Sequence, residues 1–133
     1  MAKIASFRQL IAWQKAMDLA ETCYVICREL PDSEEFVLGA QLRKAAISVP
    51  SNIAEGQRLT TRSFRAHLRI ALGSAAEIET QMELARRLGF VTPDTVDAAL
   101  TQAEEVARLL RGLMVSLPRT SPGRTSTTAT LQR

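Results

Sequence analysis

Apolar residues recur along most of the chain at alternating spacings of three and four, which is the period of an amphipathic helix. Turn signals divide this pattern into four segments, which cover residues 7–30, 35–55, 61–88 and 93–117. The connections between the segments are short, so consecutive helices should run antiparallel. The sequence therefore predicts an all-α protein in which residues 1–117 form an up-down-up-down antiparallel four-helix bundle.

Each segment carries one apolar stripe, and these stripes predict the core of the bundle. The predicted core positions, in chain order, are Leu10, Trp13, Met17, Ala20, Tyr24 and Cys27; Leu38, Leu42, Ala45, Ala46, Val49, Ile53 and Ala54; Phe64, Leu68, Ala71, Ala75, Ile78, Met82 and Ala85; and Val96, Leu100, Ala103, Ala107, Leu110, Met114 and Leu117. The two cysteines, Cys23 and Cys27, are expected to be small hydrophobic residues at or beside the first stripe.

Several residues mark the expected ends of the helices. Thr60 or Thr61 can cap the third helix, and Gly89 can end it in the left-handed conformation. Thr92 followed by Pro93 is typical of a cap and a first helical residue, which predicts the start of the fourth helix.

Pro50 lies inside the second predicted helix. Proline has no N–H to donate and its ring clashes with the preceding turn, so we expect a kink or a short break near Ser48–Pro50. The polar residues around it allow two interpretations. Their side chains satisfy backbone groups that the proline leaves unpaired, or Arg43, Asn52 and Glu55 form a ligand site.

The composition is that of a soluble globular domain. Hydrophobic residues make up 46% and charged residues 23% of 133 residues, while aromatic residues are only 5%. No apolar run reaches the roughly 18 residues that a membrane span needs, and the start of the chain lacks the apolar region of a signal peptide. We therefore expect a cytoplasmic protein with no membrane partner.

The net charge of +3 arises at the end of the chain. Residues 118–133 carry Arg119, Arg124 and Arg133 and no acidic residue, whereas residues 1–117 hold 14 basic and 14 acidic residues. The segment 118–133 is rich in Thr, Ser and Pro, so we predict that it is a disordered basic tail. Nucleic-acid binding by the folded part then requires a local basic cluster.

The sequence offers little for catalysis or for a bound metal. His67 is the one histidine, so no pair of Glu-x-x-His motifs can build a di-iron site. Cys23 and Cys27 lie four residues apart, but no second pair completes a zinc site. No glycine-rich phosphate loop is present. We therefore expect a protein that is not an enzyme and that needs no cofactor.

A row of arginines stands out near the start of the third helix. Arg58, Arg62, Arg65 and Arg69 are spaced by four, three and four residues, and no acidic residue occurs between positions 56 and 76. The row has three interpretations: a solvated helix face, contacts with nucleic-acid phosphates, or salt bridges to another subunit.

Several motifs together resemble one known family. They are Phe7-x-x-Leu10-x-x-Trp13-Gln14-Lys15-Ala16-x-Asp18-Leu19, then the stretch 41–56 (QLRKAAISVPSNIAEG), then Ile70-Ala-Leu-Gly-Ser74 and Glu77-x-Glu79-Thr-Gln81. Over about residues 7–90 the chain resembles the bacterial four-helix bundle family of the 23S rRNA intervening-sequence proteins. That family is related to the accessory proteins of diversity-generating retroelements.

The resemblance implies a ring-like homopentamer without enzymatic activity and with a poorly defined role. It also implies contact with nucleic acid, and the residues of this chain that correspond to a contact surface are Arg43, Lys44, Arg58, Arg62, Arg65 and Arg69. Our first hypothesis is accordingly a self-assembling adapter that touches structured RNA or DNA through phosphates. The alternative is an oligomeric scaffold that binds a protein partner and no nucleic acid.

Overall fold

The computed structural model describes residues 6–119. Four long helices account for most of them: α1 (Ile11–Cys27), α2 (Leu38–Gln57), α3 (Thr61–Arg87) and α4 (Pro93–Ser116). Two short 3-10 helices, η1 (Phe7–Gln9) and η2 (Asp32–Glu34), precede α1 and α2. No strand occurs between residues 6 and 119. The predicted disordered tail lies, from residue 120 onward, outside the described residues.

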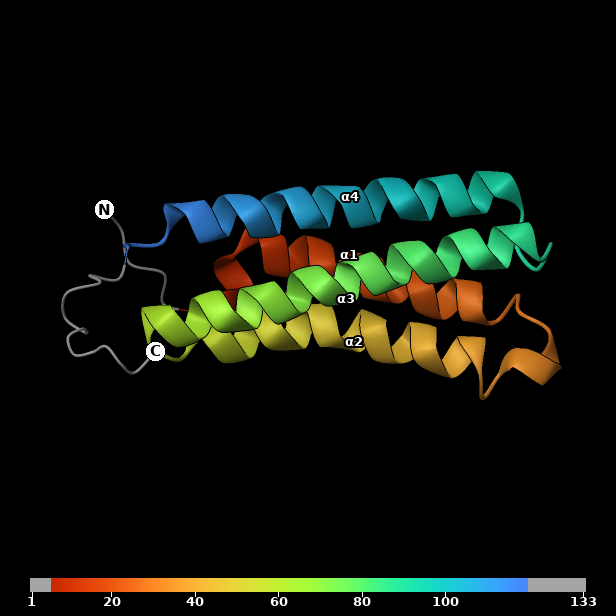
Figure 1. Cartoon of the computed structure of the whole chain (residues 1–133), viewed down its shortest axis with the longest axis horizontal. Helices are drawn as coiled ribbons and strands as arrows, with labels where there is room; N and C mark the ends of the chain where they lie inside the picture. Colours follow the sequence, from red (N-terminus) through yellow and green to blue (C-terminus); the bar gives the residue numbers. More distant parts are fainter. Residues whose placement is uncertain (1–5, 120–133) are drawn as a thin grey trace, which may run out of the picture.

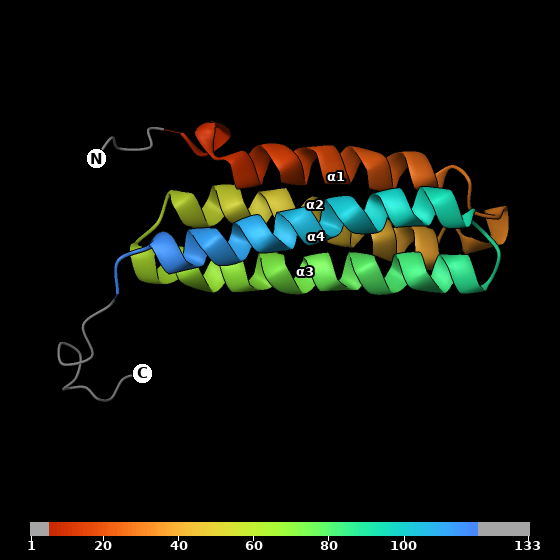
Figure 2. The same ribbon diagram turned by 90° about the horizontal axis from the view of Figure 1, so that it is seen from above.

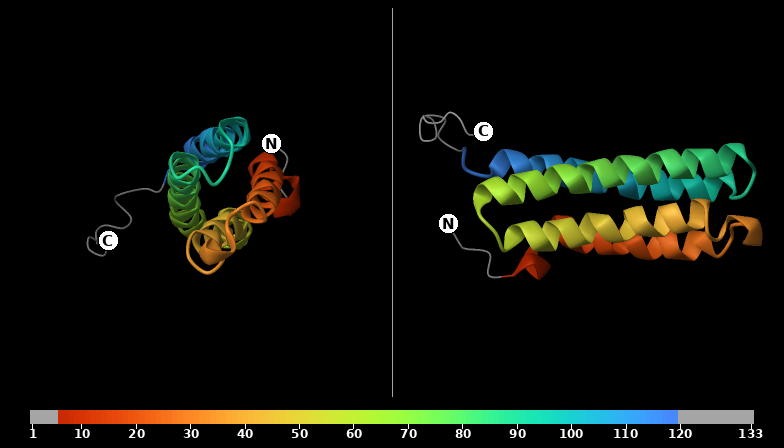
Figure 3. Two further views of the ribbon diagram at one scale, coloured as in Figure 1. Left: turned by 90° about the vertical axis from the view of Figure 1, so that its right-hand side faces the viewer. Right: turned by 60° about the horizontal axis from the view of Figure 1, so that its bottom comes forward.

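The four helices run along one long axis, and each is antiparallel to the next (Figure 1). The connections α1–α2 and α3–α4 lie at one end, while the α2–α3 turn, η1 and the end of α4 lie at the other (Figure 2). Helices α1 and α3 each pack against both α2 and α4, which closes the bundle seen along its axis in Figure 3. The fold is the predicted up-down-up-down four-helix bundle.

The core lies between the helices, and the predicted stripes of the later helices fill it. Every predicted position of α3 is buried, as is every predicted position of α2 except Ala54. In α4 the stripe is buried through the middle of the helix, whereas Leu100, Met114 and Leu117 are half-buried. Burial of these side chains is the main stabilising term for the fold.

The stripe predicted for α1 is wrong by one position along the helix. Met17 and Tyr24 are exposed, and the residues that face the core are Ala12, Ala16, Leu19, Cys23 and Ile26. The predicted and the observed residues both recur at spacings of three and four. The predicted set has the larger side chains, so a pattern based on large apolar residues predicts the wrong face of the helix. Trp13 lies at the rim and packs on Phe7 with 5.3 Å between ring centroids.

The first and second helices differ from their predicted bounds of 7–30 and 35–55, because the backbone of Leu10 and that of Val37 are not helical and α1 and α2 begin after them. The ends of α3 and the start of α4 follow the sequence signals. The Thr60 hydroxyl accepts the N–H of Ser63 at 3.2 Å, and the Thr92 hydroxyl accepts the N–H of Thr95 at 3.4 Å. Gly89 has a φ of 75°, the left-handed conformation that glycine adopts without steric cost. These caps set where α3 begins and ends and where α4 begins.

Helix α2 continues through Pro50 from Leu38 to Gln57, so the expected short break does not occur. Pro50 is itself buried. The Asn52 amide donates to the Ser48 carbonyl at 2.9 Å, which adds a side-chain bond to the backbone of the proline turn. The carbonyl that Pro50 leaves without its helical donor is that of Ala46, four residues earlier, so the bond to Ser48 strengthens the turn without satisfying the group that the proline frees.

Candidate nucleic-acid interface

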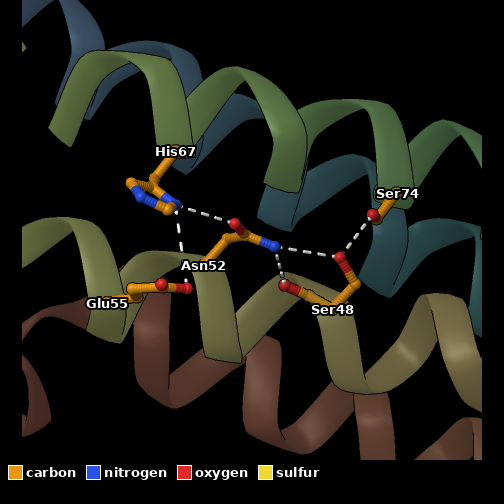
Figure 4. A network of polar contacts seen from close by, with 5 residues as sticks. All are labelled: Ser48, Asn52, Glu55, His67 and Ser74. Carbon is orange, nitrogen blue, oxygen red and sulfur yellow. Dashed lines mark hydrogen bonds and ion pairs between the residues drawn. The ribbon is translucent and has the colours of Figure 1, made fainter. Parts of the chain in front are cut away.

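A polar network joins α2 to α3 where the sequence motif around Pro50 lies (Figure 4). The Asn52 amide nitrogen donates to the Ser48 carbonyl at 2.9 Å and to the Ser48 hydroxyl at 3.0 Å. The Ser74 hydroxyl donates to the Ser48 hydroxyl at 2.8 Å, and the Asn52 carbonyl oxygen lies 2.9 Å from Nδ1 of His67. The motif therefore ties the two helices together at the middle of the bundle.

The network also assigns the tautomer of His67. Because a backbone carbonyl can only accept, the side chain of Asn52 must direct its NH₂ group toward Ser48. Its carbonyl oxygen then accepts the proton on Nδ1 of His67. Glu55 lies 3.9 Å from the same nitrogen and is exposed. The histidine is thus a structural partner of Asn52, and its place in the network explains it without a catalytic role.

The alternative ligand site around Arg43, Asn52 and Glu55 is not brought together by the fold. Arg43 and Asn52 are nine residues apart on one helix, which corresponds to about 13 Å along its axis. Arg43 instead donates to the Glu35 carbonyl at 3.0 Å and braces the connection between α1 and α2.

The two cysteines have the environment of core residues. Burial and, to a smaller extent, the neighbouring Cys27 raise the pKa of Cys23 to about 12. Burial also raises the pKa of Cys27, although Arg43 acts in the opposite direction. Since the thiolate is the nucleophilic form, neither thiol is activated.

The charged residues are segregated along the long axis of the bundle. The basic half, residues 6–17, 49–73 and 106–119, contains nine basic residues and one acidic residue, Glu55. The acidic half, residues 18–48 and 74–105, contains thirteen acidic and five basic residues. The hydrogen bond between Ser48 and Ser74 lies at the border on α2 and α3. A body that is neutral as a whole therefore has two oppositely charged ends.

Few of these charges are neutralised within the chain. Within residues 6–119 the ion pairs at 4 Å or less are Arg86 with Glu83 and, when the histidine is protonated, His67 with Glu55. Thirteen of the fourteen acidic residues lie in one half of residues 6–119, and nine of the fourteen basic residues lie in the other. Each half therefore presents its own field to partners.

The fold separates the six arginine and lysine residues predicted as a contact surface. Arg58, Arg62, Arg65 and Arg69 lie in the basic half, at the end of α2 and the start of α3. Arg43 and Lys44 lie in the acidic half, near the start of α2. About 14 residues, or roughly 20 Å of helix, separate Lys44 from Arg58. The fold therefore does not join these two groups into one cluster.

Two members of the arginine row have structural partners. Arg65 donates to the Met114 carbonyl at 2.8 Å and to the Pro118 carbonyl at 3.0 Å, so it satisfies carbonyls at the end of α4. The guanidinium of Arg58 lies 5.5 Å from the centre of the Phe7 ring. Arg62 and Arg69 are exposed on α3.

Further basic residues reach the same half from other elements. Because Arg65 of α3 donates to the Met114 carbonyl, the last turns of α4 lie beside the first turns of α3. The basic residues that sequence reasoning missed are Arg8, Lys15, Arg108, Arg111 and Arg119. Antiparallel topology was the available signal, because it places the end of a fourth helix beside the start of the third.

Residues 6–119 contain neither a metal-binding cluster nor a helix that could cross a membrane. No three His, Cys, Asp or Glu side chains there are grouped so that they could hold a metal ion. None of the helices in this part combines the length and the apolar character that crossing a membrane requires.

Comparison with known proteins identifies a family and a similar fold. A family model described as 23S rRNA-intervening sequence protein matches residues 8–112. A crystal structure from Bacteroides thetaiotaomicron VPI-5482, of a protein with unknown function from the S23 ribosomal protein family, is similar with a TM-score of 0.74. It is 24% identical, and the match covers 78% of this chain and 98% of that one. At this identity the likeness shows a shared fold. No curated protein matches the chain.

Proposed function

The chain belongs to the family of 23S rRNA-intervening sequence proteins, and we propose that it is a non-enzymatic, self-assembling cytoplasmic adapter that binds structured nucleic acid. The observation that carries this proposal is the charge of the basic half, which contains nine basic residues and one acidic residue. Such a surface attracts a polyanion even though the described part of the chain is neutral as a whole.

The contact residues in this proposal are exposed arginines on two neighbouring helices. Arg62 and Arg69 come from α3, and Arg108 and Arg111 come from α4. A guanidinium binds phosphate oxygens through two parallel N–H donors, so this surface suits a sugar–phosphate backbone. Arg65 contributes charge but already uses its donors at the end of α4.

Recognition in this proposal is by phosphate position and shape. Base-specific reading of single strands needs aromatic rings on which bases can stack. In the basic half Phe7 and Trp13 pack on each other and Phe64 is buried, while the exposed Tyr24 lies in the acidic half. The surface therefore suits duplex or folded nucleic acid.

Self-assembly is the second part of the proposal. The resemblance of the sequence implies a homopentamer, and several copies would present several basic halves to one nucleic acid. The alternative, an oligomeric scaffold that binds only a protein partner, predicts assembly without any affinity for RNA or DNA.

The test is binding of the full chain to a folded RNA and to a DNA duplex across a salt series. The Arg69→Gln/Arg111→Gln variant should bind more weakly, with a salt slope reduced by roughly 0.9 for each lost phosphate contact. The matched control is Arg28→Gln/Arg87→Gln, which removes the same charge from exposed positions in the acidic half.

The two variants separate a local surface from general charge. Normal binding by the control with weakened binding by Arg69→Gln/Arg111→Gln supports the basic half as the contact surface. Equal effects of both variants would contradict it, because net charge alone would then account for affinity. Absence of binding by the unaltered chain would favour the protein scaffold.

A further inference from the structure

A groove runs between α1 and α4 in the acidic half of the bundle. Its volume is about 680 Å³, and no basic residue lines it. Four carboxylates line it, those of Asp18, Glu21 and Glu29 from α1 and that of Asp94 from α4. Two apolar residues of α1, Val25 and Ile26, also line it. The groove therefore combines an apolar surface with a negative rim.

The groove has the features of an uncovered contact surface. The side chain of Val25 is 49% exposed, although valine gains free energy from burial. None of the four carboxylates lies within 4 Å of a basic group of residues 6–119. An occupant that supplied one apolar side chain and two or more positive charges would complement both properties.

A segment with those properties lies at the opposite end of the same chain. In the turn between α2 and α3, Leu59 is 52% exposed and directly follows Arg58. Arg62 follows it in the first turn of α3 and is also exposed. The turn thus presents an apolar side chain between two guanidinium groups, on the end of the bundle farthest from the acidic connections (Figure 2).

We propose that the α1–α4 groove of one copy receives the Arg58–Arg62 turn of a second copy. The inference rests on the proposed self-assembly and names the two surfaces that perform it. Leu59 would lie against Val25, and the guanidinium groups would face the carboxylates on the rim. The large charge difference between the two halves favours this contact over any that sets like halves together.

The geometry of this contact determines the type of assembly. The groove and the turn are different surfaces, so the interface is heterologous, and its repetition builds a closed ring or an open filament. Copies packed side by side in register would place basic half against basic half, which repulsion opposes. The proposed contact is staggered and avoids that cost. It takes Arg62 from the proposed nucleic-acid surface and leaves Arg69, Arg108 and Arg111 available for nucleic acid.

The test is an exchange of charge between the two surfaces. One full-length variant carries Glu21→Lys/Glu29→Lys in the groove, and the other carries Arg58→Glu/Arg62→Glu in the turn. Mass is measured by sedimentation at micromolar concentration in low and high salt, and thermal melting verifies that each variant is folded. The matched control is Glu77→Lys/Glu104→Lys, an equal reversal in the acidic half outside the groove lining.

Each variant alone should associate at least about tenfold more weakly, because both then bring like charges together. Mixing the two should restore assembly, since the reversed groove attracts the reversed turn and the two native surfaces also remain complementary. The control should assemble like the unaltered chain, and high salt should weaken assembly.

Two other results would overturn the inference in different ways. Assembly of the unaltered chain that persists in both charge-reversal variants, or that mixing fails to restore, would exclude this contact while self-assembly stands. A monomer in the unaltered chain at micromolar concentration would exclude self-assembly and the contact with it. Nucleic-acid binding is measured separately through Arg69 and Arg111, so its failure is distinguishable from either result.

Discussion

Gly56 in α2 faces His67 in α3 at a separation that leaves no room for a side chain. A Cβ atom placed on Gly56 would lie 2.7 Å from the Cβ of His67 and 3.0 Å from the Cδ1 of Phe64. These neighbours cannot easily move, because His67 is held by Asn52 and Phe64 is buried in the core. Helix α2 therefore approaches α3 closely at a position where it has no side chain, two residues before the turn that begins at Arg58.

Substitution of Gly56 tests this close approach. Gly56→Ala should lower the free energy of unfolding by about 1–3 kcal/mol, because the extra methyl group forces the helices apart. The control is Gly73→Ala in α3, where a Cβ would meet nothing within 4 Å. That change should raise the free energy of unfolding by about 0.5–1 kcal/mol, since alanine is the better helix former. Denaturant titration measures both, and equal effects of the two changes would contradict the packing described here.

The hydroxyl pair Ser48 and Ser74 should act as one unit. Ser48→Ala removes an acceptor that both Ser74 and Asn52 use, and Ser74→Ala removes a donor in a buried position. The double variant should cost less than the sum of the single variants, with a coupling of about 0.5–1.5 kcal/mol. A double-mutant cycle by urea unfolding measures the coupling. Strict additivity would show that the bond across α2 and α3 contributes nothing.

Loss of the Arg65 side chain should lower the stability of the fold, unlike loss of the exposed Arg62 in the same row. Because it donates to carbonyls of Met114 and Pro118, Arg65→Gln should lower the free energy of unfolding by about 1–3 kcal/mol. Arg62→Gln removes an exposed side chain and should change stability by about 0.5 kcal/mol or less. Thermal melting of the two variants checks the difference. A stable Arg65→Gln protein would mean that the end of α4 does not need this side chain.

Glu79 should make stability depend on pH in a predictable direction. Burial raises its pKa above 4.5, the neighbouring Glu104 raises it further, and Arg111 partly opposes both. The folded state therefore holds this proton more tightly than the unfolded state, and the contribution of Glu79 to stability falls as pH rises through the two pKa values. Glu79→Gln removes that cost, so its Tm should exceed that of the unaltered chain by ~2 °C at pH 7.

The difference in Tm should shrink toward zero as the pH falls below 4.5, where Glu79 is protonated in both states. Thermal melting at several pH values measures it, with Glu77→Gln as the control because Glu77 is exposed on the same helix. A constant difference across the pH range would show that the charge of Glu79 is not its cause.

The four helices, the ends of α3 and the start of α4 could be predicted from local signals, because the chemistry that sets them is local. The apolar period marked all four helices, and Thr60, Thr92 and Gly89 act through bonds to residues a few positions away. The face that α1 turns to the core could not be predicted this way. Two stripes one position apart fit the same period, and the choice between them is made by the packing of α1 against α2 and α4.

The candidate site also has a part that the sequence predicts and a part that only the fold brings together. The row from Arg58 to Arg69 is visible along the chain because its members are neighbours on one helix. Its extension to Arg108 and Arg111, and the separation of Arg43 and Lys44 from it, follow from the antiparallel arrangement of the helices. The structural duty of Arg65 depends on a carbonyl 49 residues away. Charges that cancel in the composition are separated in space, because side chains distant in sequence share an end of the bundle.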